Sequence, residues 1–180
     1  GAPGGDGGGG GAMPEPEPCV GCARLSVPLD AEDDRARFVL TLPQLTDLSN
    51  GVVRIRVAGV QATGGIVRPY VQQGGEFTAQ VGEGVPLASI GTTPEDIVWD
   101  LVLVAADFDL TEIARIGIEI SATGSTSWLN PTVLDVDLVA VSGATPALET
   151  WMFDTSDSVS TLQHNVTTVE ILEGARKGDV

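Results

Sequence analysis

Basic residues, cysteine and histidine are all scarce in this chain of 180 residues. Nine Lys and Arg residues stand against 25 Asp and Glu residues, which gives a formal net charge of −16. Because phosphate binding needs a positive surface, this balance argues against a nucleic-acid partner and against an anionic membrane surface. The single histidine, His164, excludes multi-His metal sites. No apolar run approaches the roughly 20 residues that span a bilayer, so we predict no membrane insertion.

The sequence also offers little for catalysis. Carboxylates are plentiful, so composition does not exclude a glycosidase pair. Ser158, Ser160 and His164 lie close in sequence, but nothing around them resembles a nucleophile elbow. The connections between apolar segments are short, whereas hydrolases usually carry long functional loops. We therefore predict that the chain is not an enzyme.

Residues 1–22 contain no pattern that could pack into a core. Glycines dominate their first half, and a Pro-Glu-Pro-Glu-Pro stretch follows. Gly-rich segments are flexible and Pro-rich segments are extended, so we predict a disordered linker, with residues 23–180 forming one folded domain. The linker either tethers this domain to an anchor or another domain, or is an end without a role. The absence of an initial Met and of a signal peptide suggests a mature segment of an exported protein, secreted or held at the cell surface.

Cys19 and Cys22 form a C-x-x-C motif at the end of this linker. No βαβ pattern follows, so a thioredoxin-like redox motif is not indicated. A zinc site would need a second Cys pair, which the sequence lacks. In an exported protein, the pair is expected to form a local disulfide.

Short segments with period-two alternation of apolar and polar residues begin at Cys22. Gly, Pro and Asn interrupt them about every ten residues, a pattern typical of a β-sandwich. We therefore predict an all-β fold, an antiparallel β-sandwich, with one short helical turn at residues 110–114. The predicted strands lie within residues 38–42, 53–57, 66–72, 99–103, 116–120, 132–141, 151–153 and 166–172.

Arg68, Tyr70 and Gln72 share one face of a predicted strand. A cation, a ring and an amide make a poor core but a reasonable sugar platform, because sugars stack their C–H faces on rings and need polar partners for their hydroxyls. Trp128 lies among small polar residues in a predicted loop that also holds Asn130. It either contacts a sugar or plugs one end of the sandwich. We predict that all five residues bind carbohydrate.

Asp135 and Asp137 lie on one face of an otherwise apolar predicted strand. An unpaired buried carboxylate is costly, so either a cation or an exposed sheet face must explain them. Ca²⁺ takes six to eight oxygen ligands and would suit such carboxylates. Residues 30–34 hold a second acidic cluster, which is either a solvated turn or a further group of oxygen ligands.

Several strand motifs are similar to those of a known family. The most specific are Arg68-Pro-Tyr-Val-Gln72, Arg115-Ile-Gly-Ile-Glu-Ile120 and Val133-Leu-Asp-Val-Asp-Leu138. With these motifs the chain resembles bacterial carbohydrate-binding modules of the galactose-binding-like jelly-roll type, which are attached to secreted mannanases and cellulases. The resemblance covers roughly residues 23–142. Trp151-Met-Phe-Asp154 is a possible addition that either closes the same sandwich or opens a second module.

This resemblance implies a jelly-roll fold and a non-catalytic, monomeric domain that binds a plant or microbial polysaccharide beside a fused or neighbouring catalytic domain. It also implies a structural Ca²⁺ held by Asp137 and Asp154. The chain departs from these modules just after the Pro-Tyr-Val-Gln strand, where they usually carry an aromatic residue and this chain has Gln73-Gly-Gly-Glu-Phe77. The alternative function is that of a structural or adhesive surface domain without a sugar site. A small hydrolase or lyase is a third possibility, for which the sequence offers no catalytic constellation.

Overall fold

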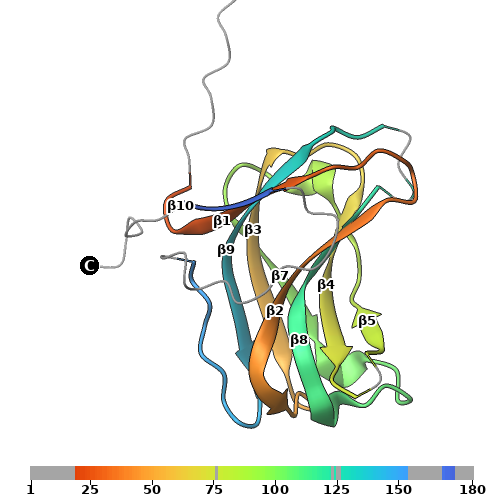
Figure 1. Ribbon diagram of the computed structural model, residues 1–180, viewed down its shortest axis with the longest axis vertical. Helices are drawn as coiled ribbons and strands as arrows, with labels where there is room; N and C mark the ends of the chain where they lie inside the picture. The colour runs from red at the N-terminus through yellow and green to blue at the C-terminus, as the bar shows by residue number, and fades with distance from the viewer. Residues whose placement is uncertain (1–18, 76, 123, 125–126, 154–167, 173–180) are drawn as a thin grey trace, which may run out of the picture.

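Two antiparallel β-sheets pack face to face in the computed structural model (Figure 1). The structure describes residues 19–75, 77–122, 124, 127–153 and 168–172. Its strands are β1 (Cys22–Val27), β2 (Arg35–Thr46), β3 (Val52–Gln61), β4 (Ile66–Gln73), β5 (Ala79–Val81), β6 (Val85–Pro86), β7 (Glu95–Asp100), β8 (Ile113–Ser121), β9 (Thr132–Ser142) and β10 (Thr168–Leu172). The predicted antiparallel all-β sandwich is confirmed.

The strands divide between two sheets of five. Sheet A has the order β10-β1-β9-β3-β7, and sheet B has the order β2-β8-β4-β5, with β6 also paired to β4. Three short 3₁₀ turns, η1 (Leu87–Ser89), η2 (Leu101–Leu103) and η3 (Leu110–Glu112), lie in the connections. The turn η3 falls within the predicted helical turn. No helix in the described part of the chain has the length and apolarity needed to cross a membrane.

Period-two alternation places one side of each strand in the core. In β8, Ile116, Ile118 and Ile120 are fully buried between the sheets, while Arg115 and Glu119 lie on the opposite face. Complete burial of one such aliphatic side chain contributes about 1.5–3 kcal/mol. The inner faces of the two sheets therefore supply most of the stability, and their outer faces carry the polar side chains.

The chain after β9 returns to the same sandwich. Trp151 exchanges two backbone hydrogen bonds with Val139, at 2.9 and 3.0 Å. Phe153 lies in the core, where its ring centroid is 5.7 Å from that of Phe38 at an interplanar angle of 60°. The strand β10 pairs with β1. The segment around Trp151 and the strand β10 thus belong to the same sandwich, where each pairs with a strand of sheet A.

The sandwich has two ends with different connections (Figure 1). At the η3 end, β4 finishes and β8 begins, so that Gln73 pairs with Ile113. At the opposite end, β8 finishes at Ser121, and the chain crosses to β9 at Thr132. These two ends hold the loops on which a ligand site can be built.

Candidate binding site at the η3 end

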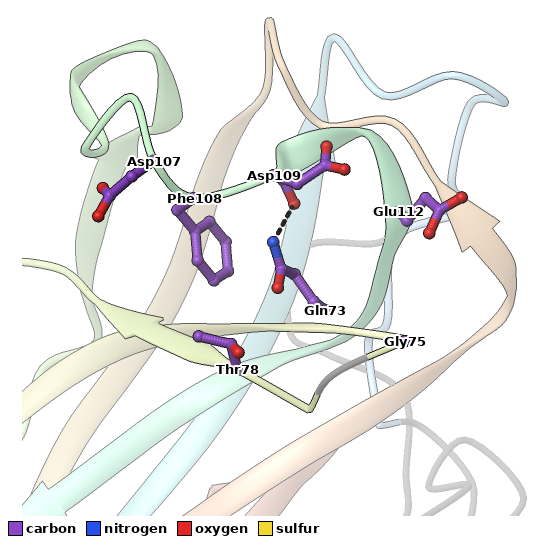
Figure 2. A pocket seen from close by; sticks show the side chains of 7 residues that line it. All are labelled: Gln73, Gly75, Thr78, Asp107, Phe108, Asp109 and Glu112. Atoms are coloured by element: carbon purple, nitrogen blue, oxygen red, sulfur yellow. Dashed lines mark hydrogen bonds between the residues drawn. The ribbon is translucent and has the colours of Figure 1, made fainter.

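A pocket of about 360 Å³ opens at the η3 end, between the β4–β5 connection and the loop that precedes β8 (Figure 2). Its lining residues are Gln73, Gly75, Thr78, Asp107, Phe108, Asp109 and Glu112. A second pocket of about 420 Å³ shares Asp107, Phe108 and Asp109 with the first and continues along η2. Together they form one concave surface at this end of the sandwich.

Hydrogen bonds hold the two walls of the first pocket in place. The backbone N–H of Gln73 donates to the carbonyl of Thr78 at 2.9 Å and closes the β4–β5 connection. The next N–H, that of Gly74, donates to the carbonyl of Glu112 at 2.9 Å. Across the pocket, Nε2 of Gln73 donates to the carbonyl of Asp109 at 3.1 Å (Figure 2). The pocket is therefore formed before any ligand arrives, which lowers the entropic cost of binding.

The pocket is acidic. Asp109 precedes η3, and its carboxylate accepts hydrogen bonds from the Thr111 hydroxyl at 2.6 Å and the Thr111 N–H at 2.8 Å. These hydrogen bonds lower the pKa of Asp109, so this carboxyl group is ionised at neutral pH. Asp107 and Glu112 add two exposed carboxyl groups. The site thus offers several strong hydrogen-bond acceptors.

Two phenylalanines belong to this end of the molecule. The ring of Phe108 lines the pocket from its buried side (Figure 2). Phe77 lies in the β4–β5 connection, beside the lining residue Thr78, and its side chain is 64% exposed. The four Phe, three Trp and one Tyr of the chain all lie in the described part, and Phe77 is the only exposed one among them.

The backbone of Phe77 is strained. Its φ of 55° lies in the left-handed region, which non-glycine residues seldom occupy and which costs about 1–3 kcal/mol. Nε2 of Gln72 donates to the Phe77 carbonyl at 2.8 Å and helps to hold this conformation. Phe153, which is fully buried, has the same φ of 55°, so this conformation by itself assigns no role to Phe77.

The predicted sugar platform on β4 is covered in the structure. Arg68, Tyr70 and Gln72 do share the outer face of sheet B, but Tyr70 is only 1% exposed and lies under the Arg37 guanidinium, 4.9 Å from its ring centroid. Burial raises the pKa of Tyr70. Gln72 accepts a hydrogen bond from Arg115 at 3.1 Å. A sugar could reach the Tyr70 ring only after this layer moved.

The other two predicted sugar contacts lie at the opposite end of the sandwich. Trp128 packs against the core, and its indole N–H donates to the Leu29 carbonyl at 2.6 Å. Asn130 is exposed and donates to the Asp30 carboxylate at 2.6 Å. Of the two roles considered for Trp128, its contacts match the plug at the end of the sandwich. The five predicted residues therefore do not form one common site.

The two carboxylates considered for Ca²⁺ lie on the outer face of sheet A, where arginines approach both. Asp135 forms two hydrogen bonds of 2.8 Å with Arg24. Asp137 lies 3.8 Å from a guanidinium nitrogen of Arg56. The arginines thus supply positive charge that a cation was expected to supply. Asp154 lies outside the described residues, and Ca²⁺ binding stays a prediction.

The predicted disulfide is not formed in the structure, because no bond joins the sulfurs of Cys19 and Cys22. The sulfur of Cys22 donates a hydrogen bond to the Cys19 carbonyl at 3.4 Å. A hydrogen bond with the Cys19 side chain, burial and the negative charge of Asp135 all raise the pKa of the Cys22 thiol.

Arg56 also pairs with Asp96 of the neighbouring strand β7, at 2.7 Å, and this hydrogen bond lowers the pKa of Asp96 below its usual value of 3.8. The pair should stabilise the fold above that pH, and the contribution should disappear as the pH falls through the lower, folded-state pKa. We expect Asp96→Asn to lower the free energy of unfolding by at most about 1 kcal/mol at neutral pH, because the pair is partly exposed. Urea unfolding at about pH 7 and about pH 3 should show the difference shrinking in acid. A difference that grew in acid would contradict this account.

No protein-family model matches the chain, and no curated protein matches it either. A proposal for the function must therefore rest on the geometry of the η3 end. None of the residues that line its pockets was among the predicted site residues. The sequence analysis counted the segment Gln73-Gly-Gly-Glu-Phe77 as a departure from the resembled modules, and it therefore did not single out Phe77.

Proposed function

We propose that this protein is a non-catalytic carbohydrate-binding domain whose ligand site is the pocket at the η3 end. The observation that supports the proposal is a preformed pocket lined by carboxylate, amide and hydroxyl groups, whose lining residue Thr78 directly follows the exposed Phe77 in the chain. A ring of this kind offers a surface on which the C–H face of a sugar can stack. The polar lining offers partners for the sugar hydroxyls.

The negative charge of the pocket favours a neutral sugar ligand over an anionic one. Asp107, Asp109 and Glu112 accept hydrogen bonds but cannot donate them once ionised. Sugar hydroxyls are donors, and hydrogen bonds to an ionised acceptor are stronger than those between neutral groups. Carboxylated or sulfated polysaccharides would instead be repelled by these groups and by the net charge of −16. The ligand proposed is therefore a neutral polysaccharide.

The cellular setting is part of the same proposal. A polysaccharide outside the cell would be reached by an exported or surface-held domain, and the Gly- and Pro-rich residues 1–18 have the composition of a spacer. A fused or neighbouring catalytic domain would benefit from being held on its substrate, because tethering raises the effective concentration. We expect the domain itself to be monomeric.

Affinity electrophoresis tests the proposal. We expect the protein to be retarded in gels that contain a neutral polysaccharide, such as mannan, β-glucan or xylan, and not in gels that contain pectate. Phe77→Ala should weaken the binding about tenfold, because a stacking contact on an aromatic ring contributes about 1.4 kcal/mol. Asp107→Asn, as a separate variant, should also weaken the binding, because it removes a charged hydrogen-bond acceptor.

Asn130→Ala is the control, because Asn130 is exposed at the opposite end of the sandwich. We expect this variant to bind like the wild type. Binding that was lost in Asn130→Ala and kept in Phe77→Ala would place the sugar site at the other end. Retardation by none of the polysaccharides would reject the proposal. Self-association in that case would favour an adhesive role, for which Leu103, 82% exposed beside the second pocket, offers an apolar contact.

A further inference from the structure

Three groups that can ligate a metal converge on the outer face of sheet A. They are the sulfurs of Cys19 and Cys22 and a carboxylate oxygen of Asp135, and these atoms all lie within 4.8 Å of one another. Cys22 and Asp135 are buried, and Cys19 is half-buried. Two thiols and a carboxylate this close together can act as metal ligands. They come from two distant segments of the sequence, the start of the domain and β9.

The fold brings these groups together through strand register and one turn. Arg24 of β1 pairs with Asp135 of β9, and Cys22 lies two residues before Arg24, so all three belong to the same face of the sheet. Gly21 has a φ of 72°, a conformation that glycine adopts without strain. The turn at Gly21 returns the chain so that Cys19 comes beside Cys22. The spacing of the two cysteines is also the C-x₂-C spacing of structural zinc sites.

Arg24 makes the charges of such a site balance. Its Nε and Nη2 donate to the two oxygens of Asp135, each at 2.8 Å. Each carboxylate oxygen keeps a further lone pair, so Asp135 can accept from Arg24 and ligate a cation at the same time. Two thiolates and one carboxylate carry three negative charges, which a divalent cation and one guanidinium neutralise. A ligating carboxylate held by a hydrogen-bond donor is also the usual arrangement around protein-bound metals.

We propose that Cys19, Cys22 and Asp135 bind Zn²⁺ or a chemically similar divalent cation, with Asp135 as the third protein ligand in place of the second cysteine pair that the sequence lacks. Thiolates favour Zn²⁺ over Ca²⁺, which prefers oxygen ligands only. The two thiols release their protons to solvent as the metal binds, and a water molecule completes the tetrahedral set of four ligands. Zinc–sulfur bonds of about 2.3 Å require the three groups to close slightly around the ion.

The bound ion would join the start of the folded domain to the middle of β9. Because only the folded arrangement adds Asp135 to the two cysteines, the ion would bind the folded state more tightly and stabilise the domain by mass action. The site lies on sheet A, whereas the pocket proposed for carbohydrate lies at the η3 end. The metal proposal is therefore independent of the carbohydrate proposal. An experiment that rejects one of them does not reject the other.

Titration of the reduced full chain with Co²⁺ tests the site. We expect an absorption band in the near ultraviolet from thiolate-to-cobalt charge transfer, which Zn²⁺ should abolish by displacement. Zn²⁺ should also raise the melting temperature. Cys19→Ser should weaken Zn²⁺ binding, measured by competition with a chelator, more than about a hundredfold, because even the loss of a group that only supports a ligand costs 10–100-fold.

Asp96→Asn is the matched control, because Asp96 is also a carboxylate paired with an arginine on the outer face of sheet A. It should bind Zn²⁺ like the wild type. Asp135→Asn should weaken binding while leaving the thiolate band; if it does not fold, Cys19→Ser still decides the question. Absence of the band in the reduced wild type would overturn the proposal, and so would equal Zn²⁺ binding by wild type and Cys19→Ser.

Discussion

Phe153→Ala is expected to lower the free energy of unfolding by about 3–5 kcal/mol, the largest effect of any single truncation considered. The Phe153 side chain is fully buried and packs against Phe38 between the two sheets. Truncation would remove this burial and leave a cavity at the centre of the core. The residue comes after β9, so the result would also show that the segment around Trp151 is needed for the stability of the sandwich.

Phe77→Ala is the control for this substitution. Phe77 and Phe153 both have a φ of 55°, so the backbone strain is alike at the two positions. Only their burial differs, since Phe77 is exposed. We expect Phe77→Ala to change the free energy of unfolding by no more than about 0.5 kcal/mol. Urea unfolding followed by tryptophan fluorescence measures both values. Similar effects of the two substitutions would show that Phe153 is not in the core.

Gly117→Ala is expected to destabilise the domain by about 3 kcal/mol, at the upper end of the usual cost of overpacking. Gly117 lies in β8 between Val39 of β2 and Tyr70 of β4. A Cβ at this position would run into the carbonyl oxygen of Phe38 and would lie 2.8 Å from the Cα of Val39. Both are backbone atoms, so relief would require β2 and β8 to move apart.

Gly75→Ala is the control, because no atom lies within 4 Å of a Cβ added at Gly75. We expect its free energy of unfolding to stay within about 0.5 kcal/mol of the wild type. The two variants add the same methyl group, and differential scanning calorimetry compares them directly. Equal melting temperatures for Gly117→Ala and the wild type would show that β2 and β8 are not packed as closely as described.

Two arginines in the described part of the chain neutralise buried acids. Arg24 pairs with Asp135 on sheet A, and Arg37 contacts Glu119 at 2.8 Å on sheet B. These contacts satisfy carboxylates that are almost fully buried, which would otherwise be costly. The carboxylates of the pocket at the η3 end are instead exposed to solvent. The uneven distribution of positive charge thus distinguishes the two sheet faces from the proposed binding site.

The alternation of apolar and polar residues predicted the sandwich because it depends on neighbours along the chain. It also placed Arg68, Tyr70 and Gln72 correctly on one face of a strand. It could not show that this face is covered, since the covering guanidinium of Arg37 comes from another strand. Period two identifies the face on which a side chain lies, whereas its exposure depends on what packs over that face.

The sequence by itself determined the class of fold, the acidic charge and the C-x-x-C spacing, because each is a local or summed property of the chain. Only the tertiary structure decided which residues meet. Arg24 and Asp135 are 111 positions apart, and the two walls of the pocket meet through Gln73 and Asp109, 36 positions apart. Such contacts follow from strand order and register, which no local pattern specifies. For that reason the proposed carbohydrate site and the proposed metal site both became visible only in the folded sandwich.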